Sequence, residues 1–194
     1  MVDGTDYELV TRVRQGDLCA FETLYHRHKR AVYRTALAIT GDPVLSEEIL
    51  QDTFLRVHRH IQDLNGQPSL APWLYRVAVN LCYSRLRRKR ARTVSLEDLP
   101  LLPRSLLGAS PEEGHYARES RSHLFAEIER LPFKQRAVLV LYYLQGFSLE
   151  EIAYMLDCPV GTVKSRLHHA RQALAAALEP GLATAPLALA PQPV

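Results

Sequence analysis

The segment 148–171, SLEEIAYMLDCPVGTVKSRLHHAR, contains two short helical patterns separated by a tight turn. Ser148 followed three residues later by Glu151 forms a capping box, in which each side chain bonds a backbone N–H at the start of a helix. Pro159 suits the first turn of the next helix, which leaves Asp157-Cys158 as the connection. This succession of signals predicts a helix-turn-helix.

The second helix of this pair sorts its residues by type around its axis. At about 100° per residue, the apolar residues share one stripe, the small and polar ones lie opposite, and cations lie on both flanks. Small polar groups can then meet base edges while cations meet phosphates, as a recognition helix in the major groove requires. A solvated basic helix is the alternative, but the capping box and turn favour DNA binding. The predicted DNA contacts are Thr162, Lys164, Ser165, Arg166, His168, His169 and Arg171.

Helical elements upstream must position this pair, and apolar residues recur at helical spacing over 9–92. Gly41-Asp42-Pro43 separates the first long run from the second as a turn, and 62–69 is a loop by composition. A third helix is expected to begin at Ala71-Pro72-Trp73, because proline is accepted in the first turn of a helix. The sequence therefore predicts an all-α first domain.

The helical pattern stops between Thr93 and about Glu119, where prolines and glycines interrupt the chain and predict a linker. Helical periodicity resumes at Leu124, breaks at Pro132 and returns as far as Gly146. The last segment contains four prolines and predicts a disordered tail. The predicted organisation is a domain at 10–92, a linker at 93–119, a second domain at 120–178 and a tail at 179–194.

Aromatic and basic residues follow one another along the predicted third helix. Trp73 and Tyr75 supply ring faces, Arg76 supplies a stackable cation, and Asn80 supplies a donor and an acceptor. Such residues suit separated single strands, whose unstacked bases need stacking partners. Two alternatives stay open: the basic end could bind phosphates without sequence preference, and Trp73 could belong to the core. The cations at this end are Arg85, Arg87, Arg88, Lys89, Arg90 and Arg92.

Acidic and amide side chains gather near the start of the second long helix, at Glu47, Glu48, Gln51 and Asp52. Acids at a helix start can simply complement the helix dipole. Leu55, an apolar residue among charges, suits instead the centre of a protein interface.

The composition argues against several other classes of protein. The chain has 194 residues and a net charge of +3, and no apolar run approaches the roughly 20 residues that a membrane span needs. Its N-terminus carries acids and no apolar segment, so we expect a cytoplasmic protein. Three distant cysteines support neither a disulfide framework nor a zinc site. The residues of each pair His26/His28 and His58/His60 are two positions apart and cannot share a helix face, so a metal site is not expected there. We expect these histidines to lie at the surface. No metal or other cofactor is predicted.

Four blocks taken together resemble a known family: AFETLYHRHKRAVYRTA (20–36), SEEILQDTFLRVHRH (46–60), PWLYRVAVNLCYSRLRR (72–88) and GTVKSRLHHAR (161–171). They are similar to the extracytoplasmic-function (ECF) sigma factors of bacterial RNA polymerase, over about residues 10–178. The resemblance implies two helical domains, like sigma regions 2 and 4, in a promoter-recognition subunit without catalysis of its own. It also implies binding to the clamp of the largest polymerase subunit and the flap of the second largest, and inhibition by an anti-sigma protein.

The resemblance further assigns sites to particular residues. The second domain would read the −35 element through the seven recognition-helix residues given above. Polymerase binding would fall to Glu48, Gln51, Asp52, Leu55 and Arg56. The −10 element, including a flipped-out base that helps to open the duplex, would contact Asp63, Asn65, Gln67, Ser69, Trp73, Tyr75, Arg76, Asn80, Arg87 and Arg88.

The chain departs from the family at His168 and His169, where relatives often carry arginine, so the upstream contact is expected to be weaker, to read another base or to depend on pH. A free-standing helix-turn-helix regulator is the alternative within DNA binding, although the acidic group and the aromatic-basic helix argue against it. An enzyme is disfavoured, because the sequence contains no phosphate loop, nucleophile motif or metal cluster.

Overall fold

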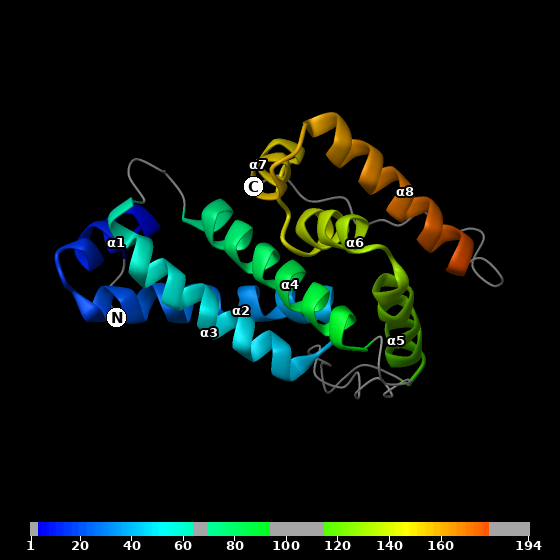
Figure 1. The fold of residues 1–194 in the computed structure, drawn as a ribbon, viewed down its shortest axis with the longest axis horizontal. Helices are drawn as coiled ribbons and strands as arrows, with labels where there is room; N and C mark the ends of the chain where they lie inside the picture. The colour runs from blue at the N-terminus through cyan, green and yellow to red at the C-terminus, as the bar shows by residue number, and fades with distance from the viewer. Residues whose placement is uncertain (1–3, 64–69, 94–114, 179–194) are drawn as a thin grey trace.

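A computed structural model describes residues 4–63, 70–93 and 115–178, with side chains described for all of these except 90–93 and 115–122. The described chain is helical and contains no strand, which confirms the all-α prediction (Figure 1). Its helices are α1 (Asp6–Arg14), α2 (Leu18–Thr40), α3 (Pro43–His60), α4 (Ala71–Thr93), α5 (His115–Arg130), α6 (Phe133–Leu139), α7 (Leu149–Leu156) and α8 (Val160–Leu178), with a 3₁₀ turn η1 (Ile61–Asp63) and a π-helical turn η3 (Val140–Leu144).

Short polar side chains start several of these helices. Asp17 accepts a hydrogen bond from the backbone N–H of Ala20 at the start of α2. Asp42 does the same at the start of α3, directly before the Pro43 of its first turn. These bonds satisfy backbone donors that would otherwise lack partners, so the helix starts follow from local sequence.

Helices α1 to α4 form a first bundle around one apolar core. Leu24 and Val32 of α2 meet Phe54 of α3 and Leu74 of α4, and all four side chains are buried. The ring of Phe54 also lies edge-on to Tyr25 at a centroid distance of 4.9 Å. The core follows the apolar stripes predicted from the helical spacing.

Helices α5 to α8 form a second bundle. Ile128, at the end of α5, packs with Leu139 of α6 and with Ala170 and Leu174 of α8. Helix α5 begins at His115, so the first turn of this bundle lies within the stretch predicted as linker. Pro132 separates α5 from α6, where the sequence pattern predicted a break.

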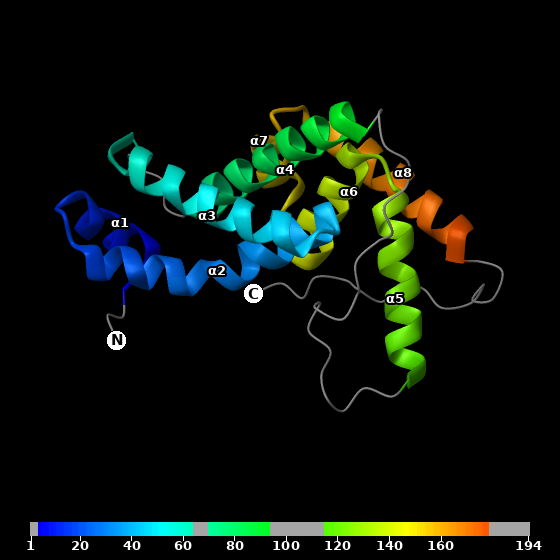
Figure 2. The same ribbon diagram turned by 60° about the horizontal axis from the view of Figure 1, so that its bottom comes forward.

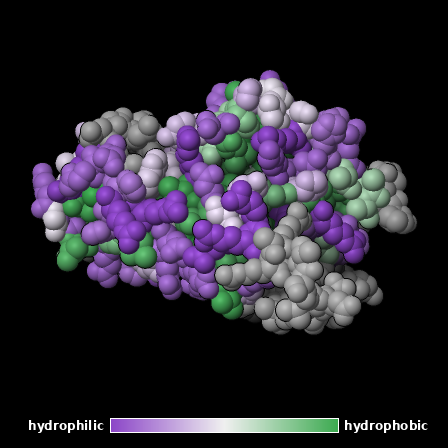
Figure 3. Space-filling view, viewed as in Figure 1, coloured by the Kyte–Doolittle hydropathy of each residue, from purple (hydrophilic) through white to green (hydrophobic). Residues whose placement is uncertain are grey.

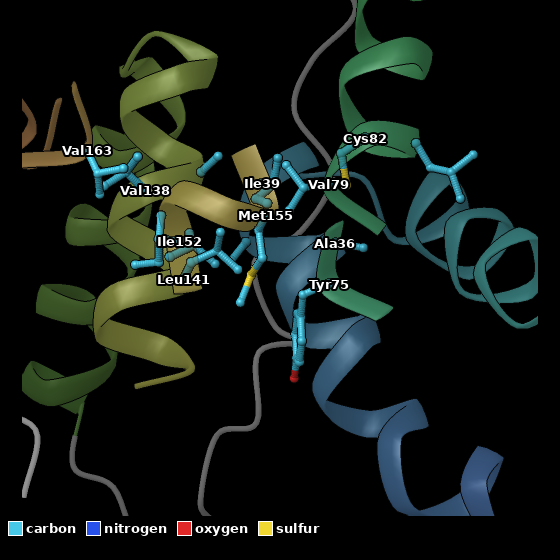
Figure 4. Close-up of a cluster of buried hydrophobic side chains, with 14 of the residues drawn as sticks. Ala36, Ile39, Tyr75, Val79, Cys82, Val138, Leu141, Ile152, Met155 and Val163 are labelled. Atoms are coloured by element: carbon cyan, nitrogen blue, oxygen red, sulfur yellow. The ribbon is translucent and has the colours of Figure 1, made fainter. Parts of the chain in front are cut away.

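The two bundles pack directly against each other through a third apolar cluster, which the sequence did not predict. Figure 4 shows Ala36, Val79 and Cys82 of the first bundle facing Ile152 and Met155 of the second. Helix α4 lies between the rest of the first bundle and α7 in Figure 1, and Figure 2 shows α7 behind α4. The interface between the bundles is therefore an extension of the hydrophobic core.

The loop between α2 and α3 lies close to α5 of the second bundle. Gly41 adopts a left-handed conformation with φ of +68°, which glycine tolerates without steric cost. A Cβ at this position would lie 2.7 Å from the Oε1 atom of Glu129 in α5, so a larger residue would displace the end of that flexible side chain.

No helix of the described part of the chain is both long and apolar enough to cross a membrane. The face drawn in Figure 3 is largely hydrophilic, with apolar residues in several separate places.

Candidate nucleic-acid and protein interfaces

The helix-turn-helix has the geometry that its sequence predicts. Ser148 and Glu151 complete a capping box at the start of α7, with bonds of 3.2 and 2.8 Å. Asp157 ends the helix in the left-handed conformation, with φ of 49°, which short polar side chains tolerate. Helix α8 then begins at Val160, one residue after the proline predicted to open it. The turn fixes the direction in which α8 leaves the core.

Helix α8 buries one stripe and exposes the opposite face. Val163, Leu167, Ala170 and Leu174 are buried, as predicted from the periodicity. The predicted DNA-contacting residues divide into an exposed group, Lys164, Ser165, His168, His169 and Arg171, and a half-buried pair, Thr162 and Arg166. The structure brings all seven onto one helix, so a single insertion into a groove could engage them together.

Two cations on opposite flanks of this face are held by neighbours. Arg171 donates from Nε to the hydroxyl of Tyr143 at 2.7 Å, and its guanidinium lies 5.4 Å from the centre of that ring. The ring of Tyr142 lies 5.7 Å from the same guanidinium. Arg166 points toward Cys158, with Nη1 3.5 Å from Sγ. Sequence reasoning missed Tyr143, because the tyrosine lies on a different element from the helix it supports.

Residues of α4 that were assigned to the −10 strand lie on different faces of the helix. Asn80, Arg87 and Arg88 are exposed, and their spacing of seven and eight residues places them along one side. Tyr75 is instead 4% exposed, and its hydroxyl donates to Oε1 of Gln145 at 2.8 Å. Burial raises the pKa of Tyr75 to about 12, although Thr35 and Arg34 act in the opposite direction.

Arg76 also engages the second bundle rather than solvent alone. Its Nη1 donates to the backbone carbonyl of Tyr154 at 3.1 Å, and its guanidinium lies 5.2 Å from the centre of that ring. Of the residues assigned to the −10 strand, Tyr75 is therefore buried and Arg76 is partly covered by α7 in this structure.

The remaining −10 candidates lie near the start of α4, in η1 or outside the described residues. Trp73 is half-buried and packs against the core of the first bundle, so the ring serves packing even where part of it is accessible. Asp63 is exposed in η1, where a ring nitrogen of His60 lies 3.1 Å from its carboxylate. Asn65, Gln67 and Ser69 fall outside the described residues.

The acidic group on α3 forms an exposed surface that is tied to α4. Glu48, Gln51, Leu55 and Arg56 are exposed, with Leu55 at 55%. Arg85 of α4 bridges Glu48 at 3.2 Å and Asp52 at 2.6 Å, so Asp52 is only half-exposed. Sequence reasoning counted Arg85 among the cations of α4 but did not predict this bridge. The pairing holds the two carboxylates in fixed positions on the face of α3.

A hollow of about 420 Å³ lies beside this bridge, between the start of α3 and the end of α4. Lys89 contacts Asp42 there at 3.0 Å. Burial alone would raise the pKa of Asp42, but the backbone N–H of Leu45 and the Lys89 ammonium outweigh it and lower the pKa below its ordinary value. The hollow is lined by both charge signs and contains no cluster of metal-binding side chains.

One surface expectation for the histidines was wrong. His28 is only half-exposed, and its Nε2 lies 2.8 Å from the Asp6 carboxylate of α1, which also accepts from Arg27. His26, His58 and His60 are exposed, as expected. Within the described residues, no group of three or more histidine, cysteine or acidic side chains could hold a metal ion.

Two known protein families match this chain, one in each half. The family described as Sigma-70 region 2 matches residues 24–92, from within α2 almost to the end of α4. The family described as Sigma-70, region 4 matches residues 124–174, which include the helix-turn-helix.

Curated proteins match over nearly the whole chain. The ECF RNA polymerase sigma factor SigW of Bacillus subtilis is 33% identical over 172 residues, which are 85% of this chain and 92% of the relative. The ECF RNA polymerase sigma-E factor of Escherichia coli K12 is 33% identical over 185 residues, 91% of this chain and 95% of the relative. The RNA polymerase sigma-H factor of Pseudomonas aeruginosa is 32% identical over 182 residues, 90% of this chain and 94% of the relative.

Two solved structures share the fold. CnrH in complex with the cytosolic domain of CnrY superimposes with a TM-score of 0.68 at 23% identity, over 92% of this chain and 99% of that one. The sigma factor RpoE of Bartonella quintana, in complex with the anti-sigma factor NepR, gives a TM-score of 0.66 at 23% identity, over 83% and 98%.

Proposed function

This chain belongs to the sigma-70 family, as one of its extracytoplasmic-function sigma factors, and we propose that it directs core RNA polymerase to promoters through three surfaces. Helix α8 reads the −35 element, α4 and the segment before it contact the opened −10 strand, and the exposed face of α3 docks on the clamp of the largest polymerase subunit. The flap of the second largest subunit would hold the second bundle. The chain would act in the cytoplasm, without catalysis of its own.

The observation that carries the −35 assignment is the exposed face of α8. Small and polar side chains occupy its centre, and Lys164, Arg166 and Arg171 flank it, on a helix whose opposite stripe is buried in the second bundle. Base edges in the major groove can be read only by side chains that reach them without steric obstruction, while phosphates on either side attract cations. Ser165 and His168 would contact bases, and the three cations would contact phosphates.

The polymerase assignment is supported by the chemistry of the α3 face. Leu55 is 55% exposed amid Glu48, Gln51 and Arg56, which is the pattern of an apolar centre within a polar rim. The bridge from Arg85 holds two carboxylates of this rim in place before any partner binds, which reduces the ordering cost of docking.

Regulation by an anti-sigma protein is part of the proposal. Two solved structures with the same fold are complexes, one with the cytosolic domain of CnrY and the other with the anti-sigma factor NepR. The surfaces proposed here for polymerase and DNA are the ones that such a partner would have to cover in order to inhibit.

A promoter-binding series tests the residue assignments. Holoenzyme formed with Ser165→Ala or His168→Ala should lose discrimination at one or two −35 base pairs, by about 5- to 100-fold at each. Lys164→Ala should weaken binding to all −35 sequences alike. Equal loss of discrimination in Lys164→Ala and Ser165→Ala would contradict the division between base and phosphate contacts.

A further inference from the structure

We propose that α1 is a brace for promoter recognition, in which Arg14 positions η1 and thereby holds the Asp63 carboxylate for a base of the opened −10 strand. The inference rests on the proposed function, because Asp63 belongs to the residues assigned to that strand. No residue of α1 is part of the polymerase and DNA surfaces proposed above. Arg14 would be a positioning residue, since it acts on DNA only through η1.

Hydrogen bonds in both directions join the end of α1 to η1. Nε of Arg14 donates to the backbone carbonyl of Ile61 at 2.9 Å. The side-chain amide of Gln62 donates from Nε2 to the backbone carbonyl of Arg14 at 3.2 Å. Ile61 and Gln62 are the first two residues of η1, and Asp63 is the third. Arg14 thus bonds both of the residues that directly precede Asp63.

The Ile61 carbonyl lies at the end of α3, where backbone carbonyls lack partners within the helix. A cation at this end of a helix also interacts favourably with the negative pole of the helix dipole. Arg14 reaches this carbonyl from another helix, 47 residues earlier in the chain. The position of η1 therefore depends on α1 and not on α3 alone.

The rest of α1 is fixed within the first bundle. Leu9, Val10 and Val13 are buried in the same apolar core as Ile61. At the start of the helix, the Asp6 carboxylate bonds side chains of α2. Figure 1 shows α1 beside the end of α3. Helix α1 therefore connects α2, at its first turn, with η1, at its last.

The guanidinium of Arg14 occupies a position that costs free energy. Its Nη2 is buried and has no hydrogen-bond partner among the described residues. A buried donor without a partner is unfavourable, and an apolar side chain of similar length would avoid this cost. The contribution that an apolar side chain could not make is the bond to the Ile61 carbonyl. Arg14 therefore serves to fix η1.

The chemistry of Asp63 explains why its position matters. Its side chain is exposed, and a ring nitrogen of His60 lies 3.1 Å from the carboxylate. An ionised carboxylate only accepts hydrogen bonds, so a base that it reads must offer a donor, such as the exocyclic amino group of adenine or cytosine. Such a contact requires the acceptor to lie within about 0.5 Å of its working position. A shift of η1 would therefore reduce discrimination between bases more than total affinity, to which phosphate contacts contribute most.

Helix α1 contains a matched control for Arg14. Arg12 lies two residues earlier, is also half-buried and also donates from Nε at 2.9 Å, but to the carboxylate of Asp17 at the start of α2. Arg12→Met and Arg14→Met each remove a guanidinium and keep an apolar stem. Only Arg14→Met breaks a bond to η1. Arg14→Lys keeps a cation and a donor near the Ile61 carbonyl, so it should restore part of the function.

The experiment uses holoenzyme formed with the full-length chain. Fluorescence anisotropy measures its binding to labelled single strands that carry the −10 element of a promoter transcribed by the wild-type holoenzyme. Each base is changed in turn, and the ratio of affinities gives the discrimination at that position. Asp63→Ala identifies the position that Asp63 reads. There we expect Arg14→Met to lose about 3- to 10-fold in discrimination, Arg14→Lys to lose less, and Arg12→Met to match wild type.

A double substitution separates positioning from general damage to the fold. If Arg14 acts through Asp63, Arg14→Met reduces discrimination no further in a chain that already carries Asp63→Ala. The proposal is overturned if Asp63→Ala changes discrimination at no position, or if Arg14→Met matches wild type. It is also overturned if Arg12→Met loses as much as Arg14→Met, or if the loss persists undiminished beside Asp63→Ala.

Failure of the proposed function would give a different result. The wild-type holoenzyme would then transcribe from no promoter, and the assignment of Asp63 to the −10 strand would fall with that function. Amide hydrogen exchange of η1 in the free chain decides separately whether Arg14 holds this turn. Faster exchange in Arg14→Met than in Arg12→Met supports the brace, and equal exchange in the two variants overturns it.

Discussion

At the scale of single residues, the proposed DNA-binding face depends on side chains that lie outside it. Arg171 is an exposed cation, and a free arginine loses rotamer entropy when it meets a phosphate. Its bond to Tyr143 and its contacts with two aromatic rings fix the guanidinium before DNA arrives. Tyr143 is thus a positioning residue for the phosphate contact.

Substitution separates the contact from its support. Arg171→Ala should weaken promoter binding by holoenzyme about 3- to 10-fold and reduce the slope of log K against log salt by about 0.9, because one phosphate contact disappears. Tyr143→Phe keeps the ring and the cation, so we expect about a 2-fold loss with an unchanged slope. Arg30→Ala, an exposed cation of α2, is the control. Equal slopes in Arg171→Ala and wild type would show that Arg171 does not touch phosphate.

Burial of a thiol gives a second test at this scale. Burial raises the pKa of Cys82 to about 12, whereas Cys19 is exposed. At pH 8 a thiol reagent followed by mass spectrometry should therefore modify Cys19 in the folded chain well before Cys82, and both alike in denaturant. As pH rises from 9 toward 12 the unfolded chain loses this proton first, so the contribution of the protonated thiol to stability should fall. Equal rates for the two thiols in the folded chain would contradict the buried position.

At the scale of elements, one carboxylate of α1 bonds two side chains of α2. Asp6 lies 2.7 Å from Arg27 and 2.8 Å from His28, with its side chain 15% exposed. Burial by itself would raise the pKa of Asp6, but the hydrogen bonds from His28 and Arg27 outweigh it and lower the pKa below 3.8. A carboxyl group with a depressed pKa stabilises the fold above its unfolded value and stops doing so as pH falls through the folded value.

Asp6→Asn should therefore reduce the free energy of unfolding by about 1 to 3 kcal/mol at neutral pH, since two partners lose a charge in a partly buried site. The difference from wild type should shrink as pH falls below about 4. Glu22→Gln is a matched control, because Glu22 faces His26 in an exposed pair at 3.5 Å. Urea unfolding across this pH range measures the effect, and a constant difference would rule out the Asp6 carboxylate as its cause.

How far sequence predicted these elements depends on whether a signal was local. The capping box at Ser148, the turn at Asp157 and the apolar stripe of α8 all lie within one segment, and the structure has them where the pattern placed them. Gln145 and Arg85 act on residues far along the chain, so no spacing rule pointed to them. The start of α5 at His115 was missed because the prolines and glycines before it dominate the local composition.

At the scale of the whole molecule, the account requires separable surfaces for polymerase and for DNA. Leu55→Asp places a charge at the centre of the proposed polymerase face without touching either bundle core. It should reduce binding to core polymerase at least about 100-fold, as loss of a central anchor does. Leu18→Asp alters a leucine that is more exposed, at 71%, on another helix, and should leave binding unchanged. Titration of labelled chain with core polymerase distinguishes them, and equal affinities would place the docking face elsewhere.

The central claim is tested most directly by in vitro transcription with purified bacterial core RNA polymerase on a library of randomised promoters, with and without this chain. The account predicts transcripts only when the chain is present, from start sites that share one upstream and one downstream element. If core polymerase remains silent on every template while the chain alone binds duplex DNA tightly, the claim is contradicted and the chain acts as a free-standing DNA-binding regulator.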